Sequence, residues 1–219
     1  MKIINGASVT AAGSDYPALY SALDMTIEDS SVTVETPFNC IWTDSALKIK
    51  GSSRVNVKSQ NLVGYYGIGS GAGMEISDNA RIAAHDCDYG LFNNGSGDIS
   101  ISGNPHVTLD TAYGIWNYSG GGVNISGGTL ISNGSERALV YKPTLDEYVD
   151  VQVYAGADAA SAVQVSPDTD FHRQHYVKIC SAPKAIPPTG DGFDAPLWLC
   201  MLAVDTVGLL LISKRKRAA

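Results

Sequence analysis

The sequence has few charged residues, and its basic residues form a single cluster. Charged side chains make up 17 % of the 219 residues, the formal net charge is −7, and Lys and Arg gather only at residues 214–217. Proteins that bind phosphate backbones depend on clustered Lys and Arg for affinity. We therefore expect no nucleic-acid partner.

Cysteine is also scarce, and its spacing excludes the usual cysteine sites. The chain has four cysteines, with no CxxC pair and no histidine placed beside them like a metal ligand. A free cysteine behaves as a small hydrophobic residue. We therefore expect buried thiols instead of a disulfide framework, and no cofactor, for Cys40, Cys87, Cys180 and Cys200.

Glycine and short alternating stretches are abundant. The 23 glycines stand beside many Ser, Thr, Asn and Val residues, a composition that suits short β-strands and tight turns. In stretches such as 25–27 and 32–34, apolar and polar residues alternate, which places every second side chain on one face. These patterns predict an all-β protein.

A loose repeat organises residues 4–141. Each unit begins with an isoleucine, and successive leading isoleucines are 23, 22, 27, 25 and 24 residues apart. A Gly or Asp two residues later suits a corner, because these residues tolerate a left-handed backbone. A second apolar anchor follows 14 to 19 residues after the first. The leading residues are Ile4, Ile27, Ile49, Ile76, Ile101 and Ile125, and the second anchors are Leu19, Ile41, Ile68, Leu91, Ile115 and Leu139.

A single coil of this kind cannot bury its inward side chains, whereas a stack of coils can. We therefore predict a right-handed parallel β-helix of about six coils over residues 1–180. From about residue 142 the repeat fades, and we expect atypical last coils that end in a strand at 176–179. An antiparallel sandwich is the alternative, but no regular two-residue Asn-Gly turns link adjacent strands.

The C-terminal segment has a different composition. Residues 181–194 are rich in proline and predict an extended linker. The apolar run at 195–213 is long enough for a transmembrane helix. Residues 214–219 carry the basic cluster, which predicts a cytoplasmic tail by the positive-inside rule.

The pentapeptide Ile186, Pro187, Pro188, Thr189 and Gly190 resembles the Leu-Pro-X-Thr-Gly recognition motif of sortase substrates. Motif, apolar span and basic tail follow one another as in wall-anchored surface proteins of Gram-positive bacteria. The resemblance implies that a sortase cuts the bond between Thr189 and Gly190 and joins Thr189 to peptidoglycan. It also implies a secretion signal, and because residues 1–6 contain no apolar segment, we expect that the sequence begins inside the solenoid.

Aromatic residues directly follow several second anchors, and Gly69 and Val140 interrupt the series. If the anchors point inward, alternation turns these rings outward into a column, which suits stacking against sugar rings. The alternative is that the rings pack inside the coil or under a neighbouring loop. The candidate glycan-binding residues are Tyr20, Trp42, Phe92 and Trp116, whereas Tyr66, Tyr89 and Tyr113 suggest corner packing.

The body also resembles the carbohydrate-binding β-helix domains of clostridial surface proteins, which share their shape with pectate lyases and can bind calcium. The resemblance covers about residues 3–141 and rests on the coil pattern. It makes Asp86, Asp88 and Asp98 candidate calcium ligands, although solvated turn carboxylates are the alternative. We expect an adhesive or glycan-binding protein and no enzyme. The alternatives are a passive stalk and a polysaccharide lyase using Arg54 and Arg81.

Overall fold

The computed structural model describes residues 1–13, 17–60, 63–146 and 149–183. These residues belong to one compact unit, Met1–Lys184. The predicted sortase motif at 186–190, the apolar run at 195–213 and the basic tail at 214–219 lie outside the described residues. Within the described part of the chain, no helix is long and apolar enough to cross a membrane.

The first strand of every coil belongs to one parallel sheet. Neighbouring strands in this sheet come from successive coils, so each residue pairs with its equivalent in the coils above and below. The strands are β1 (Lys2–Ile3), β4 (Met25–Glu28), β7 (Ala46–Lys50), β10 (Gly73–Ile76), β13 (Ile99–Ile101), β15 (Val123–Ile125) and β17 (Thr144–Leu145).

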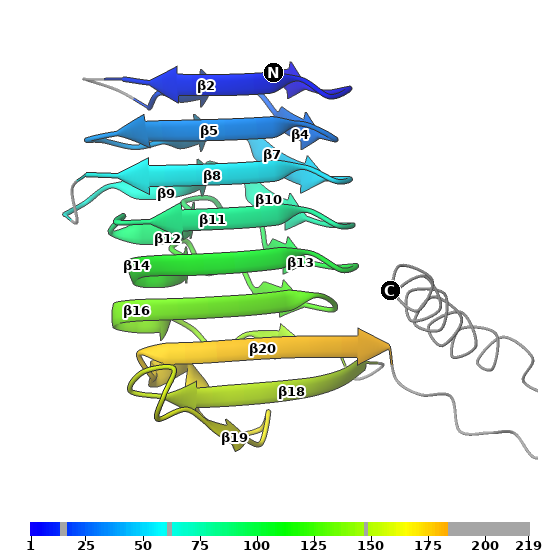
Figure 1. Ribbon diagram of the computed structural model, residues 1–219, viewed down its shortest axis with the longest axis vertical. Helices are drawn as coiled ribbons and strands as arrows, with labels where there is room; N and C mark the ends of the chain where they lie inside the picture. Colours follow the sequence, from blue (N-terminus) through cyan, green and yellow to red (C-terminus); the bar gives the residue numbers. More distant parts are fainter. Residues whose placement is uncertain (14–16, 61–62, 147–148, 184–219) are drawn as a thin grey trace, which may run out of the picture. The chain divides into compact units, whose positions relative to one another are not determined.

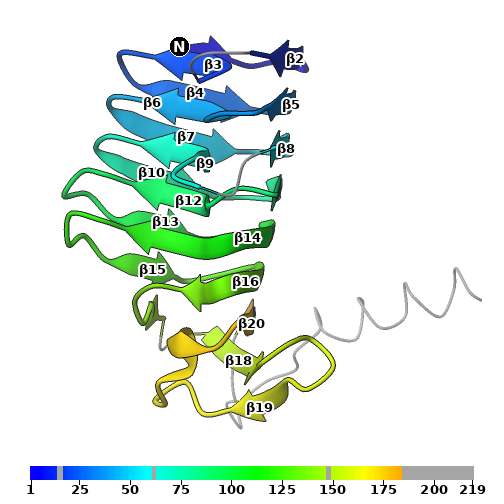
Figure 2. The same cartoon turned by 90° about the vertical axis from the view of Figure 1, so that its left-hand side faces the viewer.

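The second strands form a broad parallel face that is seen from the front in Figure 1. They are β2 (Ser8–Ala12), β5 (Ser31–Thr36), β8 (Arg54–Ser59), β11 (Arg81–His85), β14 (His106–Asn117) and β16 (Thr129–Leu139). The third strands follow a corner and stack in Figure 2 as β3 (Leu19–Ser21), β6 (Ile41–Thr43), β9 (Tyr66–Ser70) and β12 (Tyr89–Asn93), which then pairs with the second half of β14. The predicted parallel β-solenoid of about six coils is confirmed.

The leading isoleucines form a continuous buried column. Ile27 pairs with Ile49, Ile49 with Ile76, and Ile76 with Ile101, and all four are 0 % exposed. Side chains of one shape stacked at the strand spacing of about 4.8 Å can pack closely along this column.

The prediction for the first coil was wrong by one residue. Ile3, and not Ile4, pairs with Ile27, whereas Ile4 is 37 % exposed. The corner explains the shift, because Asn5 adopts a left-handed φ of 61° two residues after Ile3, as Asp29 does with a φ of 47° two residues after Ile27. Two adjacent isoleucines cannot be told apart by apolar pattern alone.

The predicted corners are confirmed in the second to fifth coils. Asp29, Gly51, Asp78 and Gly103 have φ values of 47°, 67°, 60° and 78°. The aspartates also join neighbouring corners: the Ser52 N–H donates to Asp29 Oδ1 at 2.8 Å, and the Gly51 N–H donates to Asp78 Oδ2 at 2.9 Å. Asp therefore gives both the backbone conformation and an acceptor for a neighbouring coil.

A column of buried polar side chains runs inside the third strands. Ser70, Asn93 and Asn117 are 0 % exposed and stand in register. Ser70 Oγ donates to Asn93 Oδ1 at 2.9 Å, and Asn93 Nδ2 donates to Asn117 Oδ1 at 3.0 Å. Both asparagine amides also donate to backbone carbonyls of the following turns. The repeat did not predict this column.

The C-terminal end of the stack changes to antiparallel pairing. β20 (Tyr176–Pro183) pairs antiparallel with β16 and with β18 (Val149–Gly156), and β18 pairs antiparallel with β19 (Val163–Val165). A short 3-10 helix, η1 (Phe171–Arg173), places Phe171 in the core at 3 % exposure. The predicted last strand is thereby confirmed, and it ends the parallel stack by covering the open edge of β16 (Figure 1).

Candidate functional site

The predicted aromatic residues occupy one outward column on the third strands. Tyr20 pairs with Trp42, Trp42 with Gly69, Gly69 with Phe92, and Phe92 with Trp116. Each strand alternates, so these positions face away from the buried anchors Ile41, Ile68 and Leu91. The structure thus brings together the residues that the sequence selected as a ladder.

A second tyrosine column stands beside the first. Tyr66, Tyr89 and Tyr113 pair in register, lie at or near the starts of the third strands and are half-buried against other aromatic rings. The glycines that follow them explain this position. Gly67 and Gly90 turn inward, where a Cβ would lie 3.0 Å from Val57 Cγ2 and 3.1 Å from Leu109 Cδ2, respectively. Two consecutive inward positions break the alternation, so the preceding tyrosine faces out.

The two columns pack into a continuous cluster. Tyr66 stacks on Phe92 with ring centroids 5.5 Å apart and an interplanar angle of 10°. The ring centroids of Trp42 and Tyr66 are 4.7 Å apart. Those of Tyr89 and Trp116 are 4.9 Å apart, in an edge-on arrangement. We call this set, together with the two exposed tyrosines at its ends, the aromatic surface. Its members are Tyr20, Trp42, Tyr66, Tyr89, Phe92, Tyr113, Trp116 and Tyr118.

The absence of a side chain at Gly69 allows the rings of the neighbouring coils to contact one another. A Cβ at this position would lie 2.5 Å from Cε3 of Trp42, so the indole occupies the space above the glycine. Trp42 consequently reaches Phe92 at 6.4 Å across the intervening coil. The glycine that interrupts the sequence pattern therefore connects the rings on either side of it.

Hydrogen bonds to Asp44 fix the N-terminal end of the aromatic surface. Trp42 Nε1 donates to Asp44 Oδ1 at 2.7 Å, and the Tyr20 hydroxyl donates to Asp44 Oδ2. These two bonds lower the pKa of the Asp44 carboxyl, and the bond with Asp44 raises the pKa of Tyr20. Burial raises the pKa of Tyr66 to about 12. At the other end, Trp116 Nε1 is buried and has no hydrogen-bond partner in the described part of the chain.

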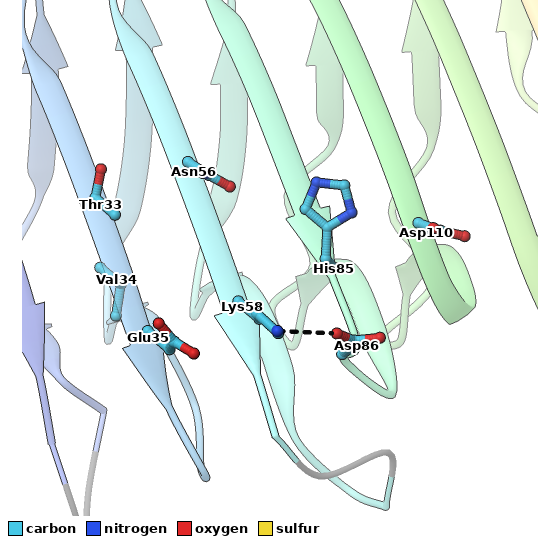
Figure 3. Close-up of a pocket in the computed structure, with 8 residues that line it drawn as sticks. All are labelled: Thr33, Val34, Glu35, Asn56, Lys58, His85, Asp86 and Asp110. Atoms are coloured by element: carbon cyan, nitrogen blue, oxygen red, sulfur yellow. Dashed lines mark ion pairs between the residues drawn. The ribbon is translucent and has the colours of Figure 1, made fainter.

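A charged groove lies on the adjacent face, over the second strands. Glu35, Lys58, His85 and Asp110 stand in register across four coils, and the groove above them has a volume of about 340 Å³. Figure 3 shows Lys58 pointing at Asp86, and their charged atoms are 3.7 Å apart. The remaining lining residues are Thr33, Val34 and Asn56.

This groove was not predicted from the sequence. Its charged members come from different coils and look scattered until the strands are aligned. The signal was present, because each of the four register residues stands three positions after the first inward residue of its strand, which is Val32, Val55, Ile82 or Val107. The candidate lyase residues Arg54 and Arg81 also pair directly. They are the first residues of β8 and β11, so they lie at the other end of these strands from Lys58 and His85.

The candidate calcium ligands lie in two different turns. Asp86 and Asp88 belong to the corner between β11 and β12, where Asp88 Oδ2 accepts from the Gly64 N–H at 2.7 Å. Asp98 precedes β13, and its two oxygens accept from the Gly122 N–H at 2.7 Å and from Asn124 Nδ2 at 2.9 Å. Among the described residues, no group of three or more His, Cys, Asp or Glu side chains could hold a metal ion. Calcium binding stays a prediction.

Comparisons of the chain with protein-family models, with curated proteins and with solved structures gave no match.

Proposed function

We propose that the solenoid is displayed on the outside of a Gram-positive cell and binds an extended glycan along its aromatic surface. The observation that carries the binding part is the contiguous set of rings on one outer face. Sugar rings present C–H faces that pack on aromatic groups, and rings repeated at the coil spacing of about 4.8 Å offer successive contacts along a polymer.

The rings of the aromatic surface are already held in place by their neighbours, which favours binding. Rings that already stack on one another, as Tyr66 does on Phe92, lose little side-chain freedom when a ligand arrives. The hydrogen bonds from Tyr20 and Trp42 to Asp44 hold two further rings in the same way. Among the described residues Trp116 Nε1 has no hydrogen-bond partner, so this donor is free to bind a sugar hydroxyl if a ligand reaches it.

A glycan array followed by isothermal titration calorimetry of a ligand found on it tests the proposal. Trp42→Ala combined with Trp116→Ala removes two rings from the aromatic surface, and we expect affinity to fall about 5- to 100-fold. The matched control is Tyr141→Ala, which removes a ring that is 49 % exposed but lies outside the aromatic surface. Unchanged affinity of the double variant would rule out the aromatic platform. An array without any ligand would favour the passive stalk.

Attachment to the cell wall is supported by the sequence at residues 186–190, followed by the apolar run and the basic tail. The proposed partners are a sortase and peptidoglycan, and the proposed location is the cell surface. Incubation of the protein with a sortase and a glycine-based amine tests this part. We expect mass spectrometry to find residues 1–189 with the added amine joined to the Thr189 carbonyl and residues 190–219 released, with no product from Thr189→Ala. Cleavage elsewhere would contradict the assignment.

A polysaccharide lyase is the second candidate, and the charged groove is the observation that favours it. Lys58 and His85 are adjacent in register and are flanked by the carboxylates of Glu35, Asp86 and Asp110. A lyase requires a base beside a group that binds an acidic sugar, and in this lining Lys58 is the cation that would bind the sugar while His85 is the candidate base. Release of unsaturated sugars from an acidic polysaccharide, followed by ultraviolet absorbance and lost in Lys58→Ala, would establish this activity. No release from a panel of such polymers would exclude it.

A further inference from the structure

Two buried thiols from different coils meet inside the solenoid. Cys40 directly precedes β6 in the second coil, and Cys87 lies at the corner between β11 and β12 in the fourth coil. Both are unoxidised and 0 % exposed, as expected for small apolar side chains, and Cys180 is half-buried and also free. Neither thiol belongs to the aromatic surface or lines the charged groove.

Gly67 of the intervening third coil allows the contact. Ile41 pairs with Ile68, which places Gly67 in register with Cys40, and the Cys40 N–H donates to the Tyr66 carbonyl at 3.1 Å. A Cβ on Gly67 would lie 3.0 Å from Cys87 Sγ. The Cys87 thiol therefore occupies the space that a third-coil side chain would fill, and there it is hydrogen-bonded to the Cys40 side chain.

The pair is polarised. Its mutual hydrogen bond, followed by burial, raises the pKa of the Cys40 thiol, whereas the bond from Cys40 lowers the pKa of Cys87. A donated hydrogen bond stabilises the thiolate of the acceptor.

We propose that Cys40 and Cys87 form an oxidation site whose product is a disulfide joining the second coil to the fourth across Gly67. The oxidant is a small disulfide. The thiolate of one of the two cysteines attacks one of the oxidant's sulfurs, which forms a mixed disulfide and releases one small thiol. The sulfur of the other cysteine then loses its proton and attacks the Sγ of the first, which releases the second small thiol. The protein loses two electrons and two protons, and the oxidant gains both.

Both sulfurs are buried, so oxidation proceeds while the coils assemble or when the corner at residues 86–88 opens. Once formed, the bond closes a loop of several dozen residues and restricts the unfolded chain. An extracellular location would supply oxidising conditions. The thiol geometry, however, does not depend on glycan binding, so either proposal can fail alone.

The test uses the full chain carrying Cys180→Ser and Cys200→Ser, refolded in a mixture of oxidised and reduced glutathione. We expect the loss of two hydrogen atoms by intact mass and one crosslinked peptide pair containing Cys40 and Cys87. The melting temperature should rise by roughly 5–15 °C over the reduced form. Gly67→Ala is expected to displace the Cys87 sulfur and lower the crosslink yield.

The wild-type chain supplies the second measurement. Under the same refolding conditions, peptide mapping should again find Cys40 joined to Cys87, with Cys180 and Cys200 absent from the main product. Free thiols at Cys40 and Cys87 in a folded product, crosslinks to other cysteines, or a lower melting temperature in the crosslinked form would each overturn the proposal.

Discussion

The side-chain amide of Asn93 donates a hydrogen bond to the side-chain carbonyl of Asn117 at 3.0 Å, which connects the fourth coil to the fifth inside the solenoid. Both residues are fully buried beside the isoleucine-lined core. Buried polar groups are costly unless they are paired. The asparagine column is therefore stabilising only while each member keeps its partners.

Asn93→Ala should destabilise the protein strongly. The substitution removes the acceptor of Ser70 Oγ and leaves Asn117 Oδ1 without its donor. We expect the free energy of unfolding to fall by about 2 to 4 kcal/mol, measured by urea denaturation. Asn94→Ala, at an exposed neighbouring position, is the control and should change it by about 0.5 kcal/mol or less. Equal effects of the two variants would contradict the role of the column.

The isoleucine column predicts a contrast between two chemically identical substitutions. Ile76→Ala opens a cavity in the core, because Ile76 is 0 % exposed, and should lower the free energy of unfolding by about 2 to 5 kcal/mol. Ile4→Ala removes an exposed side chain and should change it by about 0.5 kcal/mol or less. A large effect at Ile4 would show that the first coil has the register predicted from the sequence instead.

Gly69→Ala should disturb the aromatic surface. The added Cβ would lie 2.5 Å from the Trp42 indole, so the ring must move away from Phe92. We expect altered near-ultraviolet circular dichroism and weaker binding of any glycan ligand found on the array. Gly122→Ala is the matched control, since its nearest contact would be an ordinary 3.4 Å. Identical spectra for Gly69→Ala and the wild type would contradict the packing.

The Asp44 carboxyl should titrate below its ordinary pKa of 3.8, because Tyr20 and Trp42 donate to its charged form. Its stabilising effect is present above the unfolded pKa and is lost as pH falls through the folded pKa. For Tyr20 the folded pKa is raised, so its contribution is present below the unfolded pKa and disappears as pH rises through the folded one.

NMR titration of the carboxyl carbon measures this shift. Tyr20→Phe should move the Asp44 pKa up towards its ordinary value, whereas Tyr141→Phe, at an exposed tyrosine outside the aromatic surface, should leave it in place. An Asp44 pKa that does not respond to Tyr20→Phe would contradict the hydrogen bond.

The sequence predicted the parts of the fold in which one local signal recurs. Ile27, Ile49 and Ile76 each precede an Asp or Gly by two residues, and that pair of features marks strand and corner together. In the first coil the same signal pointed to Ile4, which precedes Gly6 by two residues, whereas Ile3 is the residue that pairs with Ile27. The antiparallel end at β18 and β20 follows no repeat, so only its last strand could be expected.

The outward position of the aromatic residues that follow the buried anchors could be predicted from the sequence, whereas the neighbouring column of tyrosines could not. Trp42 and Phe92 follow buried anchors directly, so alternation places them outside. Tyr66 and Tyr89 required knowledge that the following glycines turn inward. The charged groove depended on alignment between coils, since Lys58 and His85 are distant in sequence but adjacent in register.

Methyl NOE spectroscopy of isoleucine-labelled protein tests the stacking most directly. Parallel strands about 4.8 Å apart bring the side chains of paired residues within NOE range. The register predicts an unbroken series of NOEs from Ile27 to Ile49, from Ile49 to Ile76, and from Ile76 to Ile101. A folded protein in which these methyl groups show no mutual NOEs would contradict the solenoid and everything built on its outer faces.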